Sequence, residues 1–117
     1  MYTFYCYSKC STCKKAKKQL DDAGIKYESI DLKENPPKAD LILSWINESG
    51  LDKKKFFNTS GILYREMNLK EKLATATEEK MVEILSSNGM LVKRPLVVTD
   101  KGVLIGFKKD KWEEFFK

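Results

Sequence analysis

The chain contains no histidine among its 117 residues. Ser-His-Asp triads, Cys-His pairs and histidine-ligated metal centres all need an imidazole, so the sequence excludes each of these sites. It also has no run of about 18 apolar residues, the length that spans a bilayer as a helix. Met1 leads directly into a strand-like segment, without the basic and apolar regions of a secretory signal. Neither membrane insertion nor signal-directed secretion is predicted.

Cysteine is scarce and confined to one end of the chain. The three cysteines are Cys6, Cys10 and Cys13, and none follows. A secreted disulfide scaffold distributes its cysteines, whereas a local Cys-x-x-Cys with a near neighbour indicates redox chemistry or metal binding in a reducing compartment. A structural zinc ion needs about four ligands, which the cysteines alone do not supply, so we expect no metal. We therefore expect a cytoplasmic protein with redox-active thiols.

The charge balance is mildly basic, with 22 Lys and Arg against 17 Asp and Glu. Together with 42% hydrophobic residues, this is the composition of an ordinary globular protein. The basic residues are spread along the chain and no DNA-reading motif is evident. We expect a monomer with no direct nucleic-acid or membrane partner.

The N-terminal part of the chain shows the pattern of a β-α-β unit. Residues 2–6 alternate aromatic and small side chains, which is typical of a strand. From residue 12 or 13 onward, apolar residues recur every three or four positions, which predicts a helix that ends at Gly24. The apolar positions of this helix are Cys13, Ala16, Leu20 and Ala23. Residues 25–32 alternate again and predict a second strand.

A helical insertion is predicted at about residues 37–90. One helix is expected at 39–48, and another begins after Thr77, whose hydroxyl suits an N-cap. The apolar stripe of the first of these helices is Leu41, Ile42, Trp45 and Ile46.

The C-terminal part predicts a hairpin and a last helix. Apolar runs at 96–99 and 103–107 flank a glycine-containing turn, which indicates antiparallel strands. Asp110 and Glu113 resemble a capping box at the start of the final helix. We therefore predict one α/β domain over residues 1–117, in the order β-α-β, helical insertion, β-β-α, with a mixed four-stranded sheet.

The Cys10-Ser11-Thr12-Cys13 segment lies where the first strand gives way to a helix. Free backbone N–H groups and the helix dipole favour an anion there, so Cys10 is biased toward the thiolate, and Cys13 lies one turn away. The cation of Lys14 opposes the dipole unless an anion binds beside it. These features predict Cys10 as nucleophile and Cys13 as resolving thiol. The alternatives are that both are structural, and that Cys6, a small apolar residue suited to strand packing, is a third redox partner.

Arg94-Pro95 is the second informative feature. A proline before a strand is commonly an edge or turn device, but a cis bond presents backbone to a neighbouring site. The sequence does not decide the isomer. The Arg94 guanidinium suits an oxyanion, and Arg65 is a second candidate for that role.

The cysteine motif, the Phe57-Asn58-Thr59-Ser60-Gly61 stretch, Tyr64-Arg65 and Arg94-Pro95 together resemble the glutaredoxin-coupled arsenate reductase and Spx superfamily. The resemblance covers essentially the whole chain. It implies a thioredoxin-like fold with a helical insertion, a cis Pro95 facing the cysteines, and Cys10 as the redox nucleophile.

Within this family the chain departs from the arsenate reductase pattern. The reductases carry a His, a Ser and an Arg where this chain has Cys6, Cys13 and Lys14. Efficient arsenate turnover is therefore not expected. Their oxyanion-binding arginines map to Arg94, to Arg65 and, as a lysine, to Lys108.

Two functions follow from the resemblance. The favoured one is an arsenate-reductase-like thiol-disulfide oxidoreductase that uses Cys10 and Cys13, with Lys14, Arg65, Arg94 and Pro95 at an oxyanion site. It needs no bound cofactor, and its reductant is glutathione, bacillithiol, a glutaredoxin or a thioredoxin. The alternative is a Spx-like redox-sensing regulator that binds the C-terminal domain of the RNA polymerase α subunit.

Overall fold

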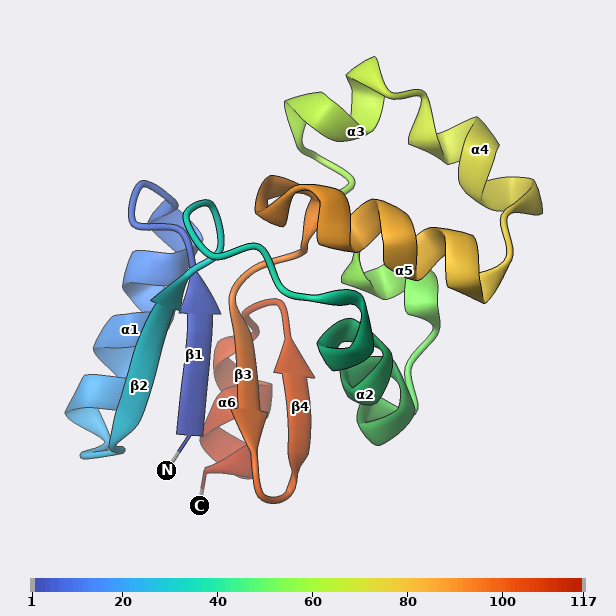
Figure 1. Ribbon diagram of the computed structural model, residues 1–117. Coiled ribbons are helices and arrows are strands. Elements are labelled where there is room, and N and C mark those ends of the chain that lie inside the picture. Colours follow the sequence, from blue (N-terminus) through green and yellow to red (C-terminus); the bar gives the residue numbers. More distant parts are fainter. Residues whose placement is uncertain (1, 117) are drawn as a thin grey trace.

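The computed structural model describes residues 2–116 and shows a mixed four-stranded sheet with helices on both of its faces (Figure 1). The strand order is β2-β1-β3-β4. These strands are β1 (Tyr2–Cys6), β2 (Tyr27–Asp31), β3 (Leu96–Thr99) and β4 (Gly102–Ile105). β1 runs parallel to β2 and antiparallel to β3, and β3 pairs with β4 as the predicted antiparallel hairpin. The predicted α/β class and mixed sheet are confirmed.

One face of the sheet is covered by α1 (Ser11–Asp22) and α6 (Lys109–Phe115). The 3.6-residue period of α1 places Cys13, Ala16 and Leu20 on its buried side. They pack in one apolar cluster with residues of β1, β3 and α6, namely Phe4, Cys6, Val97 and Trp112. The start of α1 is thereby fixed against the end of β1.

The other face is covered by the helices between β2 and β3, chiefly α2 (Ala39–Ser49) and α5 (Glu78–Ser87) (Figure 1). As predicted, Thr77 caps α5, its hydroxyl accepting the Lys80 N–H at 3.1 Å. The remaining elements of this region are η1 (Lys53–Phe56), α3 (Ile62–Glu66), α4 (Leu69–Thr75) and η2 (Gly89–Leu91). No helix in residues 2–116 is long and apolar enough to cross a membrane.

Two local predictions are wrong. Leu41 was expected in the apolar stripe of α2, but it is 37% exposed. It lies in the first turn of the helix, next to the buried Ile42 but rotated toward solvent. The capping box at Asp110 is also absent. The Trp112 N–H donates to the Lys108 carbonyl at 3.0 Å, so Lys108 rather than Asp110 is the N-cap of α6, and Asp110 lies inside its first turn.

Candidate active site at the start of helix α1

Cys10 is the N-cap residue of α1. Its backbone is extended, its N–H donates to the Tyr7 carbonyl at 2.9 Å, and its carbonyl accepts the Lys14 N–H at 3.2 Å. The side chain makes no capping hydrogen bond, so it does not satisfy the free N–H groups of the first turn. Cys10 is half-buried and carries a free thiol. A sulfur with negative charge at this position lies at the positive end of the helix dipole.

A cavity of about 680 Å³ opens beside Cys10. Its wall brings together the start of α1, the loop before α3, the segment before β3 and the turn after β4. The polar side chains that line it are Cys10, Thr12, Asn58, Ser60, Lys93, Arg94 and Lys108. Three of these are cations, and the lining contains no carboxylate among residues 2–116. The cavity is therefore suited to an anionic ligand next to a thiol.

Arg94 is the most constrained cation of this wall. Its guanidinium carbon lies 5.4 Å from the centre of the Tyr7 ring, and Nη1 is 3.5 Å from the Met90 carbonyl. Nε is buried and has no hydrogen-bond partner in the described part of the chain. An unsatisfied buried donor costs about 1–3 kcal/mol, and the cost is larger for charged groups. Arg94 as a whole lines the cavity, and its guanidinium is the kind of group that binds an oxyanion.

The segment after Arg94 adopts the isomer that the family resemblance implies. The Arg94–Pro95 peptide bond is cis. Pro95 itself is buried, and its carbonyl accepts the Gly106 N–H at 2.8 Å, which ties this loop to the end of β4.

The structure joins Cys13 to Cys6 rather than to Cys10. The two form a disulfide across seven residues, with their Cα atoms 6.0 Å apart. Both side chains are buried, Cys6 at 7% and Cys13 at 4% exposure. Cys6 therefore occupies the strand-packing position expected from its chemistry, and it also holds Cys13. The sequence offers one signal for this pairing: Cys6 ends a strand, and Cys13 lies on the buried stripe of the next helix.

Two of the predicted site residues, Lys14 and Arg65, do not line the Cys10 cavity. Lys14 is exposed and lines a separate cavity of about 280 Å³, together with Cys6 and Cys13. Arg65 is exposed on α3 and lines neither cavity. Lys108, expected only as a substitute for a family arginine, does line the Cys10 cavity.

Asn58 and Lys93 also line the Cys10 cavity, but sequence reasoning did not place them there. Asn58 belongs to the turn-like stretch that carried the family resemblance. Lys93 directly precedes Arg94, so its position beside the Arg-Pro motif was the available signal.

The resolved pKa shifts belong to tyrosines of the sheet. Burial is the main cause that raises the pKa of Tyr5, and the negative charge of Glu28 adds to it. The pKa of Tyr27 is raised to about 12, first by burial and then by the hydrogen bond that its hydroxyl donates to Asp21 at 2.7 Å. Both effects favour the neutral phenol.

A free cysteine at the start of the first helix of a β-α-β unit, close to a cis-proline loop, defines a thiol-based protein of thioredoxin-like fold. Residues 5–115 match the ArsC family, and the chain belongs to that family. The resemblance predicted from the sequence is therefore confirmed.

Three similar proteins show the range of the relatives. The uncharacterised protein YusI from Bacillus subtilis is 51% identical over 112 residues, which are 96% of this chain and 95% of YusI. The crystal structure of a possible arsenate reductase from Streptococcus mutans is 47% identical with a TM-score of 0.88, and the match covers 97% of this chain and 98% of that one. The regulatory protein MgsR of Bacillus subtilis is 32% identical over 108 residues, 90% of this chain and 82% of MgsR.

Proposed function

We propose that the protein is a thiol-disulfide oxidoreductase with Cys10 as its nucleophile. The observation that carries the proposal is the position of this free thiol at the N-cap of α1, in a cavity lined by three cations. The thiolate is the form of a cysteine that attacks a disulfide, and reactive cysteines are found at helix N-termini and beside cations. The cysteine distribution supports a reducing, cytoplasmic location.

The first two steps use Cys10 and Cys13. The Cys10 thiolate attacks one sulfur of the substrate disulfide, a new S–S bond forms, and the other substrate sulfur leaves as a thiolate. Cys13, one turn along α1, then attacks the Cys10 sulfur. The mixed disulfide breaks, the bound half of the substrate leaves as a thiol, and the two electrons gained by the substrate have come from the Cys10–Cys13 pair.

The disulfide between Cys6 and Cys13 supports a third step. The Cys6 thiolate attacks Cys13, the Cys6–Cys13 bond forms, and Cys10 is released as a thiolate with no further change in oxidation state. The disulfide then lies in the buried Cys6–Cys13 pair, and the nucleophile Cys10 is again a free thiol. Glutathione, bacillithiol, a glutaredoxin or a thioredoxin reduces the pair and closes the cycle.

The oxyanion role is assigned first to Arg94 and Lys108, which line the Cys10 cavity. Pro95 acts by holding the loop that presents Arg94. Lys14 and Arg65 act on a bound anion only through longer-range attraction, because neither lines that cavity. Arsenate turnover is expected to be slow, since the His, Ser and Arg of the reductases are absent.

Turnover of the small neutral substrate 2-hydroxyethyl disulfide tests the proposal. The variants Cys10→Ser, Cys13→Ser and Cys6→Ser are compared with the wild type by their rates and by mass-spectrometric mapping of their disulfides. Cys10→Ser should abolish turnover, and Cys13→Ser should accumulate a mixed disulfide on Cys10. Cys6→Ser should still turn over, with Cys10–Cys13 as its final disulfide. A Cys10→Ser protein as fast as the wild type would show that another group is the nucleophile.

A Spx-like regulator is the second candidate function, favoured by the similarity to MgsR over most of both chains. In this case the cysteines sense oxidation, and the output is binding to the C-terminal domain of the RNA polymerase α subunit. Retention of the protein on an immobilised α C-terminal domain, in only one redox state, supports this reading. No retention in either state, together with disulfide turnover, leaves the oxidoreductase.

A further inference from the structure

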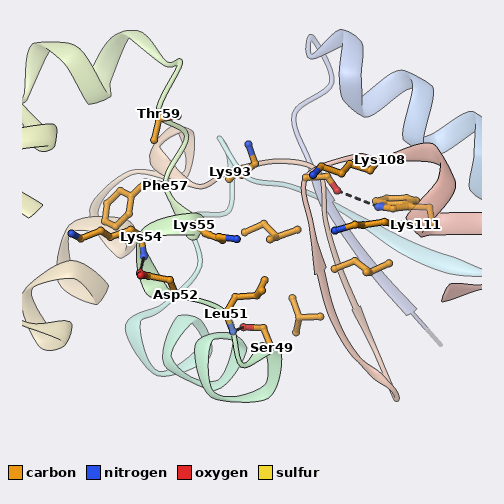
Figure 2. A pocket seen from close by; sticks show the side chains of 15 residues that line it. Ser49, Leu51, Asp52, Lys54, Lys55, Phe57, Thr59, Lys93, Lys108 and Lys111 are labelled. Carbon is orange, nitrogen blue, oxygen red and sulfur yellow. Dashed lines mark hydrogen bonds between the residues drawn. The ribbon is translucent and has the colours of Figure 1, made fainter. Parts of the chain in front are cut away.

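A third cavity, of about 760 Å³, lies between η1 on one side and β4 with α6 on the other (Figure 2). Figure 2 shows the ammonium groups of Lys55 and Lys111 directed toward one another across it, with Lys93 and Lys108 along its rim. Lys54 also lines the cavity, but its side chain extends away from the other lysines. Lys55 and Lys111 thus face the same hollow, and Lys93 and Lys108 are further cations of its lining.

None of these four lysines forms an ion pair within residues 2–116. The ion pairs of residues 2–116 lie elsewhere and are Lys18–Asp22, Lys53–Glu78 and Lys80–Glu83. Asp52, the one carboxylate that the described residues contribute to the lining, accepts the backbone N–H of Lys54 at 2.9 Å. Four unpaired like charges around one hollow raise its positive potential and attract an anion.

The floor of the cavity is the outer edge of β4. The lining includes three consecutive residues of this edge strand, Val103, Leu104 and Ile105. Because neighbouring side chains of a strand point to opposite faces of the sheet, a cavity that contacts all three runs along the edge of the strand and not over one face. The Gly106 N–H bonds to the Pro95 carbonyl on the β3 side. Along an antiparallel strand, every second residue directs its N–H and C=O groups toward the partner strand. Since Gly106 does so, Leu104 does as well, and the N–H and C=O groups of Val103 and Ile105 point outward into the cavity.

The cavity continues into the one that contains Cys10. Lys93, Lys108, Ile105 and Gly106 line both. Gly106 has φ of 73°, and a Cβ atom there would lie 3.0 Å from Cε of Lys93, so the glycine leaves room for that lysine to cross between the cavities. A ligand along β4 thus reaches toward the thiol.

Resting on the proposed function, we propose that this groove binds an acidic, extended polypeptide segment of the protein whose disulfide Cys10 reduces. The lysines attract its carboxylates, and its backbone pairs with the free edge of β4 as an added strand. The outward backbone groups of Val103 and Ile105 favour a polypeptide over a small anion. Stacking of nucleic-acid bases needs exposed rings, whereas the aromatic residues of the lining, Phe57 and Trp112, are each 1% exposed.

Binding is tested with a fluorescent, cysteine-free peptide of alternating Glu and Val, against a Gln–Val peptide of equal length. The wild type should prefer the acidic peptide, with an affinity that falls as salt is raised. Lys55→Gln/Lys111→Gln should weaken this binding by about three- to tenfold, from two exposed ion pairs. Lys54→Gln is the matched control and should change it less than twofold. In NMR spectra, the amides of Val103 and Ile105 should shift and gain protection from hydrogen exchange.

The outcomes separate this inference from the proposed function. If 2-hydroxyethyl disulfide is not reduced while the acidic peptide binds as described, the oxidoreductase fails and the groove stands as a peptide site. If that disulfide is reduced but the Glu and Gln peptides bind equally, or Lys54→Gln weakens binding as much as the double variant, the groove is not an acidic-peptide site. Tighter binding of a single-stranded oligonucleotide of equal charge also overturns it, in favour of a nucleic acid.

Discussion

The Cys6–Cys13 disulfide predicts a measurable dependence of stability on redox state. The bond closes a loop across seven residues. In the chain-entropy description, such a loop restricts the unfolded chain by about 2.4 kcal/mol at 25 °C. The perturbation is reduction of the disulfide in Cys10→Ser, which leaves Cys6 and Cys13 as the only pair that can form.

Urea unfolding of this variant, followed by far-UV circular dichroism, gives the assay. For a denaturant slope of about 1–2 kcal/mol per M, the oxidised protein should unfold roughly 1–2 M later than the reduced one. The double variant Cys6→Ser/Cys10→Ser cannot form an intramolecular disulfide and should show no such difference. Equal midpoints for oxidised and reduced Cys10→Ser, with the disulfide verified by mass spectrometry, would refute the reasoning.

Three further predictions concern packing, pH and anion binding. Gly89→Ala should destabilise the fold by about 3 kcal/mol in urea unfolding, because the added Cβ meets the backbone carbonyl of Leu32 and overpacking without relief is costly; a loss below about 1 kcal/mol would contradict this. Because the pKa of Tyr27 is raised, its contribution to stability is complete below pH 10 and is lost as the pH rises toward 12. Tyr27→Phe should therefore lose less stability than the wild type over that range, and parallel curves of unfolding free energy against pH would exclude the effect. Arg94→Lys should weaken sulfate or arsenate binding by about tenfold in NMR titrations, since one charge-assisted hydrogen bond of roughly 1.5 kcal/mol is lost; an unchanged affinity would remove Arg94 from the site.

The elements that local sequence determines were predictable. The buried face of α1 follows from the spacing of Cys13 and Ala16, and the start of α5 follows from a single hydroxyl at Thr77. The antiparallel hairpin follows from two apolar runs around a glycine turn. In each case the physical cause acts within a few residues along the chain.

The site was only partly predictable, because its members meet through tertiary packing. The bond between Cys6 and Cys13 depends on how α1 docks on the end of β1. Arg65 and Lys93 are both basic, but they differ in position. The orientation of α3 leaves Arg65 exposed and outside the Cys10 cavity, whereas the loop before β3 places Lys93 in the wall of that cavity. Spacing along the sequence carries no information on that choice.

The wall that the two cavities share limits how the protein can diverge. A substitution at Lys93, Gly106 or Lys108 alters the surroundings of the thiol and the groove along β4 at once, so selection on either one acts on both. Lys55 and Lys111 line only the groove. Paralogues that keep the same chemistry while exchanging partners are therefore expected to differ at these two positions first, and to retain the shared wall.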